Sequence, residues 1–568
     1  MKDRNQFSRY DSRSFHLLNA TQFLGAFNDN VFKLLVIYLL INVKGPAAAN
    51  TILSLAGAIF VIPFLLFSSC SGVLADRLSK RTIIVYTKIL EVLIMLFGLF
   101  AVIFQSEVGA YAALFFMASQ SALFGPSKYG IIPELVEPKM VSKANGSLTS
   151  FTYLAIILGT FIASFIADIT NKNFVIEAVF CVCIAVLGLL TSLGIRRTEP
   201  QNSPKKINPF FLYEIYQTLR FSWNVPHLLT AIFGSSFFLF VGAYVQLNII
   251  PFGMQSLGLS EVGGGYLFLA TAVGIAVGAV VAGQISKDKV EPGISCITGF
   301  FIAIFFVSLH LFSWSLTLTV LNLALLGVVG GAFLIPFDSF IQVNSPDEKR
   351  GQVIAATNFF SFIGVLAAAF ALYFISEKLG LTASSGFFVM GILIFIVNIV
   401  ITGRLSAFFF PFFAKKILKR FRKLVVTSPI PDASAVVVLR SNSWWDAILL
   451  FSCLPNLKIL LPSPLLRRFP WFNGLMDSVQ IVPSNLESGK TRAKMAERVK
   501  KLQEKGTMVC LFFPRSFTSE KTVEDYLQTF EQMRIPVVHA HGKKEKVPKS
   551  FLGYHWHQKL LEIRFAKD

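Results

Sequence analysis

The chain has 568 residues, of which 54% are hydrophobic and only 15% are charged, and its mean hydropathy is +0.63. Because a soluble globular domain carries about 25% charged residues, this composition excludes an ordinary soluble protein and indicates a polytopic membrane protein. The formal net charge is +20, and since the basic residues gather in loops between apolar stretches, we expect membrane lipids and not nucleic acid as partners.

The apolar stretches predict an all-α membrane region after a polar N-terminal segment, residues 1–14. That segment has no small-residue cleavage site after a short apolar core, so no cleaved signal peptide is expected. A helix needs about 20 apolar residues to cross a bilayer. On this basis we predict twelve spans, near residues 15–42, 49–75, 82–105, 109–127, 146–168, 174–195, 222–250, 263–286, 293–313, 315–341, 352–376 and 384–409.

The first predicted span carries a stripe of polar residues. Alternating spacings of three and four place Asn19, Gln22, Ala26, Asp29 and Lys33 on one face of a helix. An ionisable residue at membrane depth is a functional-site hypothesis by default. Asp29 and Lys33 lie four residues apart, so they can pair, and a pair that merely holds the fold is the alternative to a transport role.

The loop after the second span, residues 72–81, combines a glycine, an Asp-Arg step and a basic cluster. Asp76 can face a helix N-terminus, while Arg77, Lys80 and Arg81 can bridge carbonyl or carboxylate groups of a second helix bundle. These residues are therefore predicted to form a gating latch that stabilises one of two conformations. The alternative is that they are simply the positive charges of a cytoplasmic loop.

Further polar residues lie inside predicted spans. Glu91 comes three residues after Lys88, so a structural ion pair and a transport role both stay open. Asp338 follows Pro336 and can cap the connection between the tenth and eleventh spans. Gln120, Gln246 and Asn248 complete the set. The six cysteines show no paired spacing, and neither a disulfide framework, a metal site nor a cofactor is predicted.

Short motifs recur at an offset of about 210 residues. Residues 25–29 parallel 242–246, residues 72–76 parallel 283–288, and residues 124–126 with Asn145 parallel 334–336 with Asn358. Two parallel six-helix halves, residues 15–195 and 221–410, joined by a basic linker at 196–220, therefore predict the twelve-helix major facilitator fold. The substrate site of that fold lies near the midplane between the halves, which makes Gln246 the counterpart of Asp29.

The loop charges predict the orientation. The loops on one side carry only Lys44, Lys172 and Lys378 as basic residues, whereas the other side carries the clusters at 2–13, 77–81, 196–206 and 415–423. By the positive-inside rule both termini, and with them the C-terminal region, are expected in the cytoplasm of a multi-pass protein.

Two motifs, residues 25–33 and 124–134, resemble those of the bacterial lysophospholipid transporter family of the major facilitator superfamily, and the resemblance covers residues 15–410. It implies inward movement of lysophospholipids, notably lysophosphatidylethanolamine, across the bacterial inner membrane. Such a substrate needs a polar slot beside an apolar surface. Asp29 can hold the ammonium while Lys33 or Lys128 meets the phosphate. Gln22, Asn30 and Gln246 are the other predicted substrate-binding residues, and Asp29 is also a candidate for proton or sodium coupling.

Beyond residue 410 the long apolar stretches end and the sequence becomes more polar. Residues 411–429 form a basic linker whose stretch 411–424 predicts a membrane-surface helix, with Pro411 at its first position. Residues 430–568 predict a cytoplasmic α/β domain with strands at 435–439, 508–513 and 535–540 and a helix at 491–505.

This domain resembles the glycerolipid acyltransferase family of the 2-acylglycerophosphoethanolamine type over about 110 residues. Asp446 matches the family motif, but Ser441 stands where the catalytic histidine is expected, and serine is no base near neutral pH without a partner. In the second family motif, Phe-Pro-Glu-Gly, the glutamate and the glycine are replaced by Arg515 and Ser516. We therefore predict an acyltransferase-like domain that is catalytically inactive. Replacement of the missing base by another histidine stays open, the candidates being His539, His541, His555 and His557. Arg515 can still contact a phosphate.

Three functions follow from these patterns. The first is a lysophospholipid transporter with an acyltransferase-like tail that is not an active enzyme. The second is a bifunctional transporter and acyltransferase, and the third is a general amphiphile or drug exporter, because a fold alone does not give the substrate.

Overall fold

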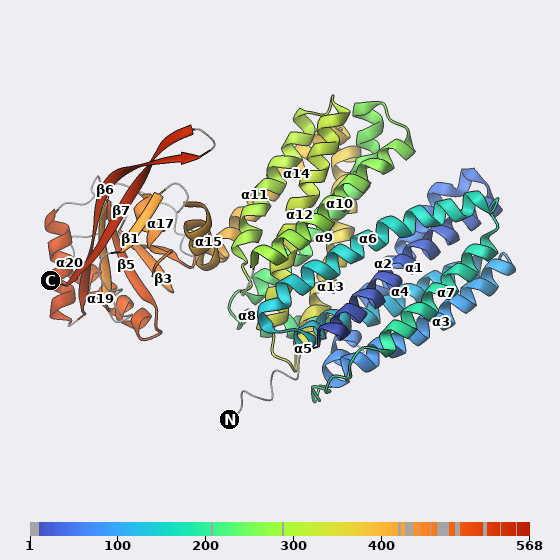
Figure 1. The fold of residues 1–568 in the computed structure, drawn as a ribbon, viewed down its shortest axis with the longest axis horizontal. Coiled ribbons are helices and arrows are strands. Elements are labelled where there is room, and N and C mark those ends of the chain that lie inside the picture. Colours follow the sequence, from blue (N-terminus) through green and yellow to red (C-terminus); the bar gives the residue numbers. More distant parts are fainter. Residues whose placement is uncertain are drawn as a thin grey trace. The chain divides into compact units, whose positions relative to one another are not determined.

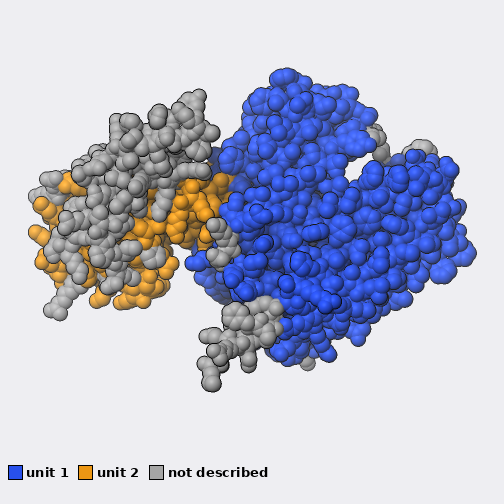
Figure 2. Space-filling model, viewed as in Figure 1, with its two compact units in different colours: residues 1–290, 298–396 blue, residues 291–297, 397–568 orange. Residues whose placement is uncertain are grey.

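The structure, a computed structural model, describes residues 11–205, 208, 210–286, 289–418, 422–426, 435–441, 444–454, 456–462, 476–482, 489–514, 520–533, 535–551 and 554–567. The chain divides into two compact units (Figure 2). The first unit comprises residues 1–290 and 298–396, and the second comprises residues 291–297 and 397–568.

Twelve described helices are long and apolar enough to cross a membrane, so the prediction of twelve spans is confirmed. They are α1 (Ser12–Lys44), α2 (Ala49–Arg77), α3 (Lys80–Ile103), α4 (Glu107–Gly130), α6 (Val141–Ile169), α7 (Phe174–Leu193), α9 (Leu228–Leu257), α10 (Glu261–Ser286), α11 (Gly293–Leu311), α12 (Leu316–Asn344), α13 (Arg350–Tyr373) and α14 (Ala383–Arg404). Shorter helices are α5 (Ile132–Leu135) and α8 (Phe211–Trp223).

Local residue chemistry explains where the spans begin and end. At the start of α1 the Asp11 carboxylate accepts the Arg13 N–H at 3.0 Å and the Ser14 hydroxyl at 2.6 Å. The hydrogen bond from Ser14 lowers the pKa of Asp11. Helices α1 and α9 each end at a glycine with positive φ, Gly45 at +88° and Gly258 at +64°, a conformation that glycine adopts without steric cost.

One predicted boundary is wrong. The seventh span was expected to begin at residue 222 after a linker at 196–220, but α9 begins at Leu228 and the separate helix α8 precedes it. Pro226 has no N–H and disfavours the helical conformation at the residue before it, and His227 has a φ of +62°. The linker between the halves therefore contains a helix of its own.

The first unit has the pseudo-symmetry that the repeats predict. Helix α2 packs on α13 and α6 packs on α10, which are the two corresponding contacts between the halves. A methyl group on Gly72 of α2 would lie 2.8 Å from the carbonyl oxygen of Gly351, and one on Gly283 of α10 would lie 2.8 Å from that of Ser142. The two repeat-related glycines thus permit two close helix contacts between the halves.

These contacts define the closed end of the bundle, where residues 72–76 meet 351–355 and residues 142–146 meet 279–283. The halves separate toward the opposite, open end (Figure 1). In space-filling view a hollow lies between two lobes of the first unit (Figure 2).

The second unit contains a sheet of seven described strands flanked by helices. The sheet order is β1-β7-β6-β2-β5-β3-β4, and all neighbours are parallel except β6 and β7. Alternate residues face opposite sides, so Val437 and Phe512 pack in one core and Val436 and Leu511 in the other. The elements are α15 (Ser406–Phe413), β1 (Arg422–Val426), β2 (Val436–Ser441), α17 (Trp444–Leu450), β3 (Leu457–Pro462), β4 (Val479–Val482), α19 (Gly489–Gln503), β5 (Met508–Pro514), α20 (Glu520–Gln532), β6 (Val537–Phe551) and β7 (Tyr554–Lys567).

The predicted surface helix at 411–424 is wrong in two respects. Pro411 lies inside α15, which begins at Ser406, and is not the first residue of a new helix. Residues 422–426 form β1, in which Arg422 lies opposite Lys559 of β7. The β-branched Val425 and Val426 suit a strand in such a ladder.

Candidate functional site

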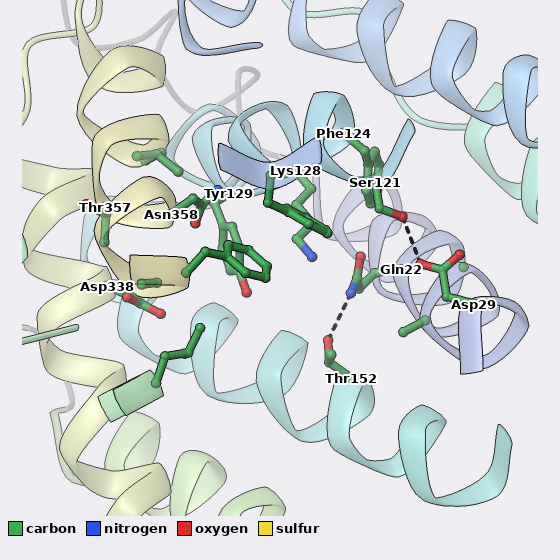
Figure 3. A pocket seen from close by; sticks show the side chains of 18 of the residues that line it. Gln22, Asp29, Ser121, Phe124, Lys128, Tyr129, Thr152, Asp338, Thr357 and Asn358 are labelled. Atoms are coloured by element: carbon green, nitrogen blue, oxygen red, sulfur yellow. Dashed lines mark hydrogen bonds between the residues drawn. The ribbon is translucent and has the colours of Figure 1, made fainter. Parts of the chain in front are cut away.

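A cavity of about 370 Å³, the polar cavity, lies between the two halves of the first unit (Figure 3). Helices α1, α2, α3, α4 and α6 contribute to it from the first half, and α9, α12 and α13 from the second. Its polar lining includes Gln22, Asp29, Ser121, Lys128, Tyr129, Thr152, Ser235, Asp338, Thr357 and Asn358. The site thus lies between the halves, as the fold class predicts.

A second cavity of about 380 Å³, the apolar cavity, adjoins the first. Both cavities are lined by Asp29, Phe60, Ile156 and Leu239. Aliphatic and aromatic side chains of α9, α10 and α12 form most of the remaining wall, among them Phe238, Val241, Val245, Phe268, Ile275 and Leu326. The predicted residues Asn30, Lys33 and Gln246 line this cavity and not the polar one.

Asp29 lies where the two cavities meet. Its Oδ2 accepts a hydrogen bond from the Ser121 hydroxyl at 2.8 Å, and its buried Oδ1 has no hydrogen-bond partner in the described part of the chain. Gln22, on the same face of α1, donates to Thr152 at 3.2 Å (Figure 3). A buried carboxylate oxygen without a donor is a ready acceptor for a cationic group.

The ion pair that the spacing allows between Asp29 and Lys33 does not form, because no described salt bridge joins them. Asp29 turns toward Ser121, whereas the Lys33 ammonium lies 5.1 Å from the centroid of the Phe60 ring. Lys33 sits one helical turn further along α1, beside the apolar cavity. The alternative that this pair merely holds the fold is therefore wrong.

Lys128 points into the polar cavity, which Lys88 also lines (Figure 3). Its ammonium lies 4.9 Å from the ring centroid of Tyr129, and its charge interacts with the carboxylates of Asp29 and Asp338. Asp29 comes from the first half and Asp338 from the second. Lys128 thus lies between acidic groups of both halves.

Asp338 does not cap a connection, contrary to the expectation. It lies inside α12, and its Oδ1 accepts a hydrogen bond from the Ser235 hydroxyl at 2.7 Å. Sequence reasoning also missed Tyr129, Thr152 and Asn358 as cavity residues. Tyr129 and Thr152 each lie beside other polar residues, and Asn358 was noted only as the repeat counterpart of Asn145, so no local pattern shows that the three residues converge.

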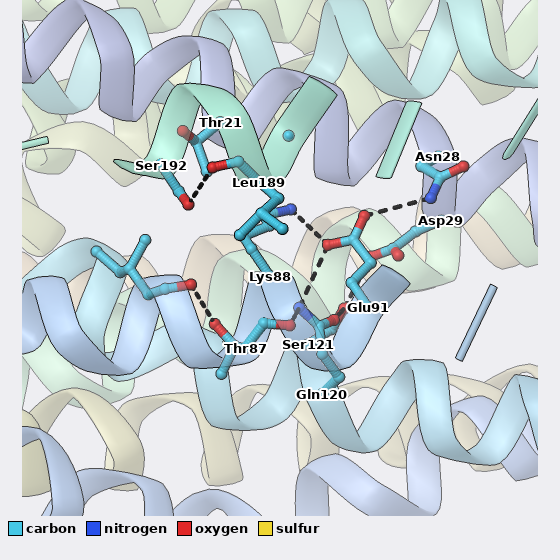
Figure 4. A network of polar contacts seen from close by, with 12 residues as sticks. Thr21, Asn28, Asp29, Thr87, Lys88, Glu91, Gln120, Ser121, Leu189 and Ser192 are labelled. Atoms are coloured by element: carbon cyan, nitrogen blue, oxygen red, sulfur yellow. Dashed lines mark hydrogen bonds and ion pairs between the residues drawn. The ribbon is translucent and has the colours of Figure 1, made fainter. Parts of the chain in front are cut away.

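Lys88 and Glu91 form the structural ion pair that the sequence left open (Figure 4). Their charged atoms lie 2.5 Å apart, and both side chains are buried. The second Glu91 oxygen accepts from Asn28 at 3.2 Å, while Gln120 donates to the carbonyl of Thr87 at 3.1 Å. This network joins α1, α3 and α4 behind Asp29.

We expect Lys88→Met to lower the stability of the protein by about 3–5 kcal/mol, because it leaves the Glu91 charge buried without its counter-ion. The double variant Lys88→Met/Glu91→Leu removes both charges and should recover most of that loss. Thermal unfolding of each purified variant in detergent measures its stability relative to the unmodified protein. A double variant as unstable as the single one would contradict the argument.

Asp76 connects the two halves at the closed end. Its carboxylate accepts the backbone N–H groups of Gly351 at 2.6 Å and Gln352 at 3.0 Å, and the Gln352 side-chain amide at 3.0 Å. It therefore faces the N-terminus of α13, as expected, where the helix dipole favours a negative charge. The carboxylate is fully buried.

The basic residues of this loop do not cross between the halves. Arg81 donates to the carbonyls of Leu193 at 3.0 Å and Ile195 at 3.2 Å, both in the first half. Lys80 pairs with Glu134 of the same half at 2.6 Å. Arg77 is exposed and has no hydrogen bond or ion pair with a described residue. The bridge predicted from Arg77, Lys80 and Arg81 is absent in this conformation, in which Lys80 and Arg81 contact acceptors of their own half.

A second polar connection at the closed end was missed. The Asn145 and Gln342 side chains exchange two hydrogen bonds, at 3.0 and 2.9 Å, and Asn145 also donates to Ser339 at 3.2 Å. All three residues are buried between α6 and α12. Asn145 belongs to the repeat, which is the one sequence signal that singles it out.

In the second unit, Ser441 donates a hydrogen bond to Asp446 at 2.5 Å in a buried position. Arg515 and Ser516 lie outside the described residues, as do the side chains of His539, His541, His555 and His557. Burial raises the pKa of the Cys510 thiol, which disfavours a reactive thiolate there. In neither unit do the described residues include a cluster of His, Cys, Asp and Glu that could hold a metal ion.

Residues 18–369 match the sequence model of a family described as the Major Facilitator Superfamily. The chain is 24% identical over 375 residues to the lysophospholipid transporter LplT of Yersinia pestis (strain Pestoides F), covering 65% of this chain and 88% of that protein. The same values hold for the protein of that name from Yersinia pseudotuberculosis serotype I (strain IP32953).

Solved structures with the same fold include the human organic anion transporter MFSD10, with a TM-score of 0.56, 14% identity, and coverage of 68% of this chain and 98% of that one. A bacterial homologue of the iron transporter ferroportin in an outward-facing state also has a TM-score of 0.56 at 14% identity, covering 69% and 99%. At such identity these structures show the fold alone.

Proposed function

This chain belongs to the Major Facilitator Superfamily and is a multi-pass membrane transporter, and from that premise we propose that it moves lysophospholipids across the bacterial inner membrane by alternating access. The observation that carries the proposal is the pair of adjoining cavities, one polar and one apolar, that meet at Asp29. A lysophospholipid has a charged headgroup and one acyl chain, so it needs such a pair.

In the proposed binding mode the headgroup occupies the polar cavity. The free Oδ1 of Asp29 accepts the ammonium of lysophosphatidylethanolamine, and Lys128 meets its phosphate. Lys128 is preferred to Lys33 for this role because Lys33 lines the apolar cavity. The acyl chain then lies along Phe238, Val241 and neighbouring apolar side chains.

The proposed transport cycle uses the closed end as its cytoplasmic gate. Described basic residues of the loops at 77–81 and 196–205 lie at this end, and the positive-inside rule therefore supports a cytoplasmic position for it and for both termini. Release of Asp76 from the N-terminus of α13, and of Asn145 from Gln342, would open that end. Asp29 stays a candidate for proton or sodium coupling in this cycle.

The experiment that tests the proposal is uptake into proteoliposomes that contain the full chain. We expect saturable uptake of radiolabelled lysophosphatidylethanolamine, with protein-free vesicles as control, and weaker uptake of lysophosphatidylglycerol, which lacks the ammonium. Equal competition by cationic amphiphiles without a phosphate would instead favour a general exporter. No uptake of any lysolipid would overturn the proposal.

The alternative hypothesis is a bifunctional protein that both transports and acylates lysophospholipids. We expect no acyl transfer from a labelled donor by the purified chain, because Ser441 occupies the position of the base and Asp446 cannot substitute for it. Asp446→Ala should therefore leave the background rate of acyl transfer unchanged. Transfer above background that Asp446→Ala removes would contradict the inactive assignment.

A further inference from the structure

Helix α8, in the linker between the halves, has its polar and apolar faces reversed. Its buried residues are Glu214, Ile215, Thr218 and Ser222, three of which are polar. Its exposed residues include Phe210 just before the helix and Leu212, Tyr213, Tyr216, Arg220 and Trp223 within it. A helix on the surface of a water-soluble domain shows the opposite arrangement.

The exposed aromatic residues form one stripe. Spacings of three, four and three residues place Tyr213, Tyr216, Arg220 and Trp223 on the same face of α8. Trp223 is 75% exposed and Tyr216 is 58% exposed. Two tyrosines, a tryptophan and an arginine on one face are typical of a contact with the membrane–water interface.

The buried polar face is satisfied within the protein. Glu214 forms an ion pair with Lys205, while Thr218 donates to the Glu214 carbonyl at 2.9 Å and Ser222 to the Thr218 carbonyl at 2.8 Å. The inward position of the polar residues is therefore stable, and the outward position of the aromatic residues follows from it.

Helix α8 lies beside the spans and not beyond them. It packs on α2 and α13, and a four-residue turn leads from it into α9. Ile215 packs with Ala356 and Phe359 of α13 in one cluster, and the Phe211 ring lies 6.1 Å from that of Phe359. Ala356 comes six residues after Arg350, which corresponds to about 9 Å along the span. Helix α8 thus lies beside the first three turns of α13 and not beyond its end.

We propose that the aromatic face of α8 is seated in the interfacial layer of the bilayer at the closed end of the transporter. The tyrosine and tryptophan rings lie at headgroup depth, and Arg220 meets anionic lipid headgroups. Lys349, 4.0 Å from the Phe221 ring centroid, adds a second cation beside the same helix. Because α8 contacts α2 of one half and α13 of the other, the lipid contact holds the linker beside the seam that must move in transport.

Tryptophan quenching in the full-length protein tests the proposal. The protein is reconstituted in phosphatidylethanolamine–phosphatidylglycerol vesicles with and without lipids brominated near the headgroup end of the acyl chain. The emission lost in Trp223→Phe gives the Trp223 contribution, which we expect to fall by at least half in brominated vesicles and to respond weakly to aqueous iodide. Trp314, 74% exposed between α11 and α12, gives the benchmark for an interfacial tryptophan through Trp314→Phe.

A second variant controls for a local structural change caused by the loss of the Trp223 side chain. Tyr216→Trp in the Trp223→Phe background should restore an emission component that brominated lipid quenches. Quenching of the Trp223 component by iodide alone would place the stripe in water and overturn the proposal. Shielding of that component from both quenchers would identify a protein occupant, such as the C-terminal region, and would overturn it as well.

Discussion

Asp29→Asn is expected to reduce lysophosphatidylethanolamine uptake by about 10- to 100-fold at subsaturating substrate. The substitution keeps the shape of the side chain but removes the charge that accepts the ammonium. A hydrogen bond to a charged group contributes about 1.5–3 kcal/mol, and about 1.4 kcal/mol corresponds to a tenfold change. The measurement is the initial rate of uptake into proteoliposomes, at equal amounts of incorporated protein.

Ser121→Ala is the matched control for Asp29→Asn. It removes the hydroxyl that donates to Oδ2 of Asp29 but leaves the carboxylate in place, so we expect a loss of less than about fivefold, which corresponds to roughly 1 kcal/mol for one neutral donor. Asp29→Asn within twofold of the unmodified protein would remove Asp29 from the binding site.

Asp76→Ala is expected to reduce transport at least tenfold by releasing the closed end. The substitution leaves three N–H donors at the start of α13 without an acceptor, namely those of Gly351, Gln352 and the Gln352 side chain. Each buried donor left unpaired costs about 1–3 kcal/mol, so the three donors together are enough to shift a two-state equilibrium at least tenfold. Asp76→Asn keeps one acceptor oxygen and should have an intermediate effect.

Hydrogen exchange at residues 350–355 measures the conformational part of this prediction, because these residues include the two backbone groups that Asp76 holds. We expect faster exchange there in Asp76→Ala. Asp168→Asn, which neutralises an exposed carboxylate at the other end of the bundle, should change neither exchange nor transport. Unchanged exchange in Asp76→Ala together with unchanged transport would show that this contact is not a latch.

The local patterns predicted features that depend on one helix or on the internal repeat. The polar stripe of α1 placed Asp29 and Gln22 at the polar cavity, because residues three and four apart must share a helix face. The repeat anticipated the matching contacts of Gly72 and Gly283. The assignment of residues 430–568 to the acyltransferase family stays a prediction, since the family match ends at residue 369.

The same patterns gave wrong contacts where a polar side chain could reach partners on more than one helix. Spacing allowed Asp29 to pair with Lys33, but Ser121 on α4 and Phe60 on α2 offer closer partners for the two residues. Pro336 suggested that Asp338 could cap a connection between spans, whereas both residues lie inside α12. A proline inside a long apolar helix is tolerated when neighbouring helices surround it, which a single segment cannot reveal.

The sequence by itself determined the membrane class, the twelve spans and the internal repeat of this transporter, because hydropathy, span length and the offset of motifs are properties of the chain alone. Only the tertiary structure decided which polar residues meet in the polar cavity, which helix N-terminus holds Asp76, and which face of α8 is outward. The physical reason is that a buried polar group must find a partner. In this bundle that partner often belongs to another helix, as Thr152 does for Gln22 and Gln342 does for Asn145.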